Sequence, residues 1–111
     1  MKINTNVLEN KMTWMGFREV TSGTAMLRYA VGYWEPGMSV TKELYPRVAK
    51  EFGTTPERAE RAMRHAIETA WDRGDPMTIN GCFGCSIDPE RGKPTVGEFV
   101  SRMARLCSNA G

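Results

Sequence analysis

The chain has 111 residues, 41% of them apolar and 25% charged, which allows one globular domain with a real core but not two. Its formal net charge is only +2, so any nucleic-acid-binding surface must come from segregation of charge and not from an excess of it. No apolar stretch approaches the length of a membrane span and no signal-peptide pattern opens the chain, so we expect a cytoplasmic protein.

The first 34 residues predict two helices of unequal clarity. Residues 1–15 form an N-terminal segment with one short amphipathic helix, for which Asn6 is the expected cap. Residues 17–34 favour a longer helix, although Gly23 and Gly32 lower its propensity and make it dependent on packing. Its apolar side chains are Val20, Ala25, Met26, Leu27, Tyr29, Ala30 and Tyr33.

Residues 41–52 and 55–73 predict two helices joined by a short turn. The first has Ser39 or Thr41 as its cap, and Pro46 near its start is expected to bend it. For the second, Thr54 and Glu57 predict a capping box, Pro56 suits the first turn, and Gly74 predicts a left-handed stop. Its helical periodicity is the clearest in the chain, with a continuous apolar stripe of Ala59, Ala62, Met63, Ala66, Ile67, Ala70 and Trp71.

Ala49, Gly53 and Ala59 have the spacing of a helix-turn-helix, with small residues where the helices cross and a glycine in the turn. Any helical hairpin with a short turn needs small residues at its crossing, so this spacing favours a helix-turn-helix only slightly over a plain hairpin. The face opposite the apolar stripe carries Arg58, Glu60, Arg61, Arg64 and His65. Guanidinium groups near the start of such a helix are suited to the major groove of DNA.

The last third of the chain predicts a short helix at 77–83, an exposed loop at 84–94 and a final helix at 95–107. Thr95 and Glu98 form a second potential capping box at the start of the final helix. Its apolar stripe consists of Val96, Phe99, Val100, Met103, Ala104 and Cys107.

Three segments of the sequence resemble one known family. They are TK-x-LYP-x-[IV]AK-x-F-x-TT, then ER-x-x-RHAIE-x-AW-x-RG, and later FG followed by KPT-x-x-EF. Together they resemble the C-terminal effector domain of the sporulation master response regulator of endospore-forming bacteria, over about Gly16 to Met103. The resemblance implies an all-α bundle of about six helices and sequence-specific binding of promoter DNA. We therefore expect an effector domain at 16–108, with the helix-turn-helix at about 41–73.

The resemblance also implies which residues contact DNA. Arg58, Glu60 and Arg61 coincide with positions that reach base edges, where arginine donates two hydrogen bonds to guanine and glutamate accepts one from cytosine. The expected contacts to the DNA backbone are Thr55, Arg64, His65, Arg73, Lys93 and Thr95. From the residues alone, a solvated helix face is about as plausible, because Glu57 with Arg61, Glu60 with Arg64, and Arg64 with Glu68 can pair at i, i+4.

Cys82 and Cys85 form a C-x-x-C, which can indicate a redox pair or half of a metal site. Cys107 and His65 are the only other soft ligands, too scattered for a closed zinc site, so two structural cysteines are the preferred interpretation. No constellation of a nucleophile with an oriented base is visible. We expect no metal, no cofactor and no enzymatic activity.

Double-stranded DNA is the expected partner; RNA polymerase and a second copy of the chain on tandem DNA sites are further candidates. Members of the resembling family carry an N-terminal receiver that is phosphorylated on aspartate, and we expect none here because the effector begins about fifteen residues after Met1. The alternative hypothesis is a protein-interaction module that pairs with a full-length regulator or a polymerase subunit. Trp14 and Trp34 are the candidate partner-facing aromatics.

Overall fold

The computed structural model describes residues 2–17, 21–74, 76–83 and 92–108. These residues form six α-helices, one π-helical turn and no strand, which confirms the expected all-α bundle of about six helices. An isolated β-bridge between Ile3 and Ser108 ties the two ends of the described chain together. The elements are α1 (Thr5–Trp14), α2 (Ser22–Tyr33), η1 (Val40–Leu44), α3 (Tyr45–Phe52), α4 (Pro56–Arg73), α5 (Pro76–Phe83) and α6 (Val96–Leu106).

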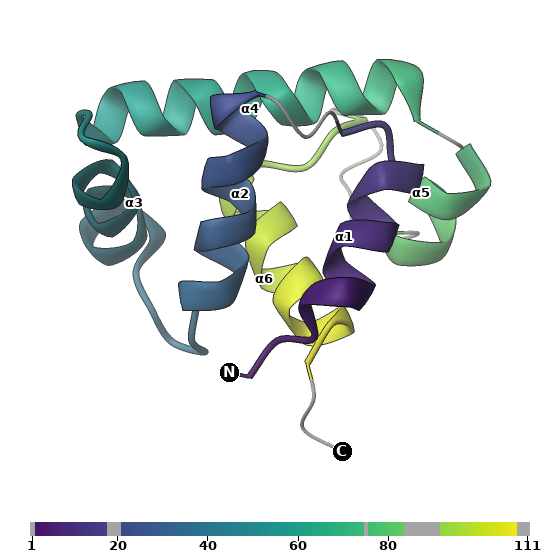
Figure 1. Cartoon of the computed structure of the whole chain (residues 1–111), viewed down its shortest axis with the longest axis horizontal. Coiled ribbons are helices and arrows are strands. Elements are labelled where there is room, and N and C mark those ends of the chain that lie inside the picture. Colours follow the sequence, from purple (N-terminus) through teal and green to yellow (C-terminus); the bar gives the residue numbers. More distant parts are fainter. Residues whose placement is uncertain (1, 18–20, 75, 84–91, 109–111) are drawn as a thin grey trace.

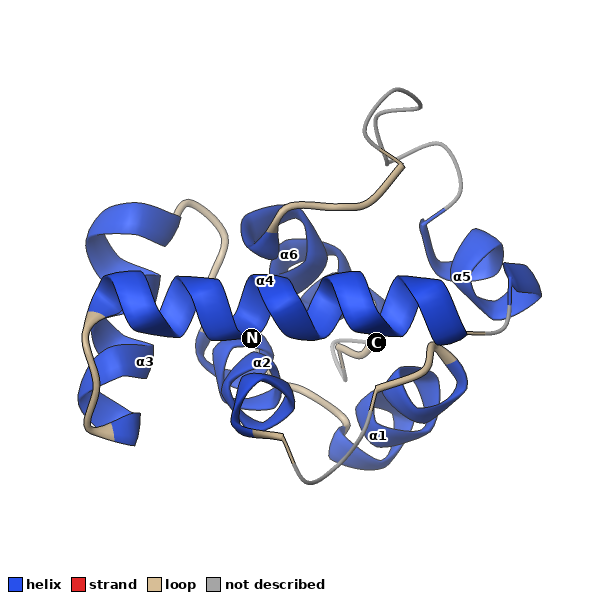
Figure 2. Ribbon diagram, turned by 90° about the horizontal axis from the view of Figure 1, so that it is seen from above, coloured by secondary structure: helices blue, strands red, loops and turns tan. Residues whose placement is uncertain are grey.

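Helix α4 lies across one side of the molecule, and the other helices lie beneath it (Figure 1). It packs against α2, α3 and α6, with α3 at its N-terminal end and α5 following its C-terminal end (Figure 1). Seen from above, α4 runs in front of all the other helices (Figure 2). One long face of α4 is therefore turned toward solvent while the opposite face covers the core.

The apolar stripes predicted for α4 and α6 form the centre of the core. In α4 the buried members are Ala59, Met63, Ala66, Ile67 and Ala70. Five of the six residues predicted for the last helix are buried in α6, and the sixth, Cys107, is the buried C-cap of that helix. An aromatic cluster joins four parts of the chain around Phe99, whose ring lies 5.2 Å from Phe17, 5.7 Å from Phe83 and 6.2 Å from Trp71, measured between centroids. Leu8 and Met12 bring α1 into the same core.

Two glycines allow backbone segments to approach α4 closely. A Cβ atom on Gly23 of α2 would overlap the carbonyl oxygen of Ala62, and one on Gly74 would overlap the carbonyl oxygen of Met15. Gly74 has an extended backbone (φ −72°, ψ 164°), so the predicted left-handed stop is wrong and the glycine is required by packing. Gly53 does adopt the left-handed conformation, at φ 65°, in the turn between α3 and α4.

Several helix starts differ from the prediction. Asn4, not Asn6, caps α1, and Thr55, not Thr54, caps α4 by accepting a hydrogen bond from the N–H of Arg58. Helix α2 begins after its cap Thr21, so the predicted start at residue 17 is too early. Each of these helices starts after a residue whose side-chain oxygen accepts a hydrogen bond from the N–H group three residues later. Several neighbouring polar residues could serve as this cap, so the sequence did not determine which of them does.

The segment before α3 is a π-helical turn, which the sequence did not indicate. Ser39 caps this turn, as predicted, through a hydrogen bond from the N–H of Lys42. Pro46 is the second residue of α3, and α3 follows the π-helical turn without a break, so the predicted helix over 41–52 changes from π to α geometry just before the proline. The predicted loop at 84–94 lies outside the described residues except for Gly92, Lys93 and Pro94.

Candidate nucleic-acid interface

Helices α3 and α4 cross through the small residues that the sequence singled out. Ala49 and Ala59 are both buried, and the N–H of Thr54 donates to the carbonyl oxygen of Ala49 at 2.9 Å across the turn. Gly53 supplies the left-handed residue of that turn. This geometry is consistent with a helix-turn-helix in which α4 is the recognition helix.

The outer face of α4 presents the predicted base-contacting residues to solvent. Arg58 and Arg61 are exposed near the start of the helix, while Glu60 is half-buried. Glu60 and the exposed Arg64 form an ion pair, with Oε2 and Nε 3.6 Å apart. A surface pair that water can reach contributes about 0–1 kcal/mol, so either partner can leave it for a DNA group at little cost.

A shallow cavity of about 440 Å³ between the start of α3 and the start of α4 adds residues that were not predicted. Thr41 and Tyr45 line it together with Glu60, Arg61 and Arg64. Burial, followed by the nearby Glu60 carboxylate, raises the pKa of Tyr45 above its ordinary value, although Arg64 opposes this. The phenol therefore stays protonated and can donate a hydrogen bond beside the residues predicted to contact bases. In the sequence, only the LYP segment of the family resemblance, which contains Tyr45, could have pointed to this residue.

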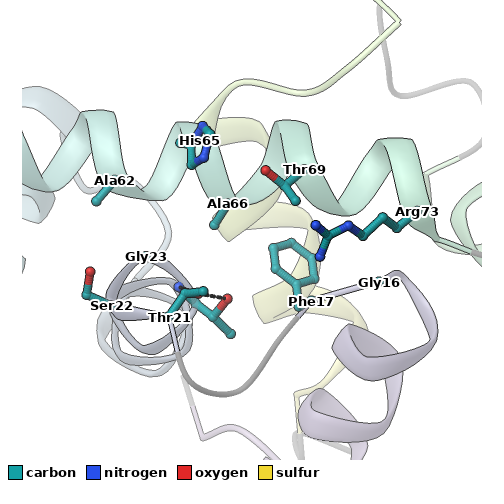
Figure 3. A pocket seen from close by; sticks show the side chains of 11 residues that line it. Gly16, Phe17, Thr21, Ser22, Gly23, Ala62, His65, Ala66, Thr69 and Arg73 are labelled. Carbon is teal, nitrogen blue, oxygen red and sulfur yellow. Dashed lines mark hydrogen bonds between the residues drawn. The ribbon is translucent and has the colours of Figure 1, made fainter.

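A larger cavity, of about 690 Å³, lies along one flank of α4 (Figure 3). His65, Thr69 and Arg73 line it from α4, and the start of α2 closes its other side. Figure 3 shows the side chain of Arg73 directed toward Phe17. The structure therefore places two predicted backbone-contacting residues, His65 and Arg73, on the same side of α4.

The other flank of α4 holds Lys93 and Thr95. Lys93 Nζ donates to Asp72 Oδ1 at 3.0 Å and to the carbonyl oxygen of Glu68 at 3.4 Å. Thr95 is the N-cap of α6: its hydroxyl accepts from the N–H of Glu98 at 3.1 Å, and its own N–H donates to Glu98 Oε1 at 2.8 Å. The predicted capping box is confirmed, and both residues are already engaged within the protein.

Residues 8–106 match the family model described as "Sporulation initiation factor Spo0A C terminal". The chain belongs to this family. The match extends from α1 to the last residue of α6, so it covers nearly the whole fold and not only α3 and α4. The Spo0A C-terminal domain is a DNA-binding effector domain, so the chain is, in general terms, a DNA-binding regulator. DNA is therefore the ligand to consider for the exposed arginines of α4.

In this domain Thr95 has a structural role that can be measured separately from DNA binding. We expect Thr95→Ala to lower the free energy of unfolding by about 1 kcal/mol, because the capping hydrogen bond to Glu98 is lost. Urea denaturation of the wild type, Thr95→Ala and Thr95→Ser measures the effect. Thr95→Ser keeps the hydroxyl and should retain most of the stability; equal losses in both variants would contradict a capping role.

The two described cysteines of the domain are buried. Cys82 is buried and its carbonyl oxygen accepts a hydrogen bond from Arg102 Nε at 2.8 Å. Cys107 is also buried, and that burial raises the pKa of its thiol, so the reactive thiolate is disfavoured. Cys85 lies outside the described residues. Among the residues that are described, no three His, Cys, Asp or Glu side chains gather as a potential metal site.

The two candidate partner-facing tryptophans of the domain differ. Trp34 is buried, with the guanidinium of Arg105 5.5 Å from its ring centroid, whereas Trp14 is 66% exposed. Met77 of α5 is 82% exposed.

None of the helices in the described part of the chain is both long and apolar enough to span a bilayer.

Proposed function

We propose that the chain is a sequence-specific DNA-binding transcriptional regulator that inserts the first half of α4 into the major groove. The observation that carries this proposal is the exposure of Arg58 and Arg61 on the outer face of a helix whose inner face is fixed in the core. A side chain reads a base edge only if its backbone is held rigidly, and the buried stripe of α4 supplies that rigidity. The family of the chain supports DNA as the ligand.

The chemistry of this helix favours a target with G·C pairs. Arg58 and Arg61 can each donate two hydrogen bonds to the O6 and N7 atoms of guanine. Glu60 can accept from the N4 amino group of cytosine once its ion pair with Arg64 opens. Arg64 is then available for a phosphate of the same groove.

Contacts to the DNA backbone are proposed on both sides of α4. Thr55 is the N-cap of α4, and Arg64 lies in the middle of the helix. His65 and Arg73 lie on the flank that faces α2, whereas Lys93 contacts Asp72 from the segment before α6, whose N-cap is Thr95. Such contacts would set the register of the domain on the duplex without reading sequence.

Selection of bound sequences from random duplexes tests this function. We expect an enriched G·C-containing motif, and we expect the selected duplex to bind about 10³-fold or more tightly than a scrambled duplex of the same composition. Both duplexes should be titrated over a range of salt concentrations, because non-specific affinity falls steeply with salt. Equal affinity for the two duplexes would exclude sequence-specific regulation.

A protein-interaction role is the second candidate, and the exposure of Trp14 and Met77 near the C-terminal end of α4 favours it. A full-length regulator of the family and RNA polymerase are the proposed partners in this role. If the wild type shows no sequence preference, this role replaces the first. Sedimentation of the protein with and without purified RNA polymerase would detect such a complex.

A further inference from the structure

We propose that Asp72 limits the affinity of the domain for DNA by competing with a backbone phosphate for Lys93. This inference rests on the proposed function. The residues named so far strengthen DNA binding, whereas Asp72 would weaken it. It starts from the ion pair in which Lys93 Nζ lies 3.0 Å from Asp72 Oδ1. The lysine also donates to the carbonyl oxygen of Glu68 at 3.4 Å, so its ammonium group is held against the surface of α4.

The ion pair lies on the face of α4 that carries a base-contacting arginine. Glu68 and Asp72 follow Arg61 by seven and eleven residues, a spacing that puts all three on one face of an α-helix. Eleven residues correspond to about 16 Å along the axis. The major groove is about 12 Å wide, so a helix with Arg61 against the bases carries Asp72 and Lys93 to the phosphates at the groove edge.

Charge is divided along this face. The first half of α4 presents Arg58, Arg61 and Arg64 with one exposed carboxylate, that of Glu57. The second half presents the carboxylates of Glu68 and Asp72 on this face, and Arg73 lies on the flank toward α2. Lys93 comes from the segment before α6 and brings a positive charge to the acidic half. While Asp72 neutralises that charge, an approaching phosphate meets a neutral pair in place of a cation.

Exposure makes this competition reversible. The side chain of Asp72 is 71% exposed and that of Lys93 is 36% exposed, so water screens their attraction. A DNA phosphate carries a full negative charge in a field of other phosphates, so it can take the ammonium group from Asp72 at small cost. The carboxylate then remains close to the phosphate and repels it.

Asp72→Asn tests the proposal because it removes the charge and keeps the shape of the side chain. We expect Asp72→Asn to bind selected and scrambled duplexes about two- to fivefold more tightly than the wild type, with a salt slope steeper by up to about one unit. Lys93→Met should weaken binding to both duplexes and lower the slope by about one unit. The ratio of the two affinities, which reports base recognition, should change little in either variant.

The double variant Asp72→Asn/Lys93→Met separates competition for Lys93 from general repulsion of DNA. If Asp72 acts through Lys93, Asp72→Asn should have almost no effect once the lysine is gone. Glu68→Gln is the matched control: it removes the same charge one turn earlier, and only the backbone carbonyl of Glu68 contacts Lys93. It should tighten binding less than Asp72→Asn.

Three results would overturn the inference: weaker binding by Asp72→Asn, the same gain from Asp72→Asn with and without Lys93, or an equal gain from Glu68→Gln. Circular dichroism of each variant shows whether the helices are retained, and a variant that loses helicity is replaced by Asp72→Ser. Failure of the proposed function has a different signature, since the wild type would then bind selected and scrambled duplexes equally.

Discussion

Alanine in place of Arg58 or Arg61 is expected to cost about 1–3 kcal/mol of binding free energy on the selected duplex, while binding to scrambled duplexes hardly changes. A bidentate contact to guanine is lost only where guanine is present, so the loss depends on sequence. Both arginines are exposed, and neither side chain makes a hydrogen bond or an ion pair to another described residue. The substitutions should therefore leave the fold intact.

Fluorescence anisotropy with both duplexes over a range of salt concentrations measures this difference. Arg105→Ala is the charge control, because Arg105 is an exposed arginine of α6 and not of α4; its guanidinium lies 5.5 Å from the ring centroid of Trp34, so circular dichroism must first show that this variant keeps its helices. It should weaken binding to both duplexes slightly and equally. If Arg58→Ala and Arg61→Ala also weaken both duplexes equally, the two arginines contact phosphates and the bases are read by other residues.

Phe99→Ala should lower the free energy of unfolding by about 3–5 kcal/mol, the largest loss that we expect from a single substitution. Phe99 is completely buried and touches rings from α4, α5 and the segment after α1. Its removal deletes a large apolar surface from the core and leaves a cavity that helices on several sides cannot all move to fill. A domain of this size has a total stability of about 5–15 kcal/mol, so part of the population should unfold.

Urea denaturation followed by far-ultraviolet circular dichroism measures this loss. Phe52→Ala is the control, because Phe52 is 36% exposed and contacts Tyr29 edge-on at 6.0 Å between centroids. Its loss should be clearly smaller. If Phe99→Ala costs less than Phe52→Ala, the aromatic cluster does not hold α4 and α6 together. DNA binding should fall in Phe99→Ala only in proportion to the unfolded fraction.

Local features of the sequence predicted most of the helices. The stripes of α4 and α6 repeat every three or four residues, and the buried residues of the structure follow them. The capping box joins Thr95 and Glu98, which are three residues apart. The left-handed conformation of Gly53 depends on the glycine itself and on no distant residue. Such features depend on chain geometry within one or two helical turns, so they are visible without a fold.

The candidate site was predicted in part. The resemblance directed attention to Arg58, Glu60 and Arg61, and the structure places all three on α4, with both arginines exposed. Their contacts with DNA remain predictions. Tyr45 was missed because its position beside Glu60 and Arg64 arises from the crossing of α3 and α4, which no periodicity describes.

By itself, the sequence determined the helical class, the buried face of α4 and the residue types that suit the major groove, because those depend on neighbours along the chain. The tertiary structure alone decided that Trp34 is buried and Trp14 exposed, that Gly74 packs against Met15, and that Lys93 meets Asp72, 21 residues away. These outcomes depend on which helices come together in space. A helix of 18 residues can bury one face against many partners, and only packing against α2, α3 and α6 selects the arrangement that places Lys93 beside α4.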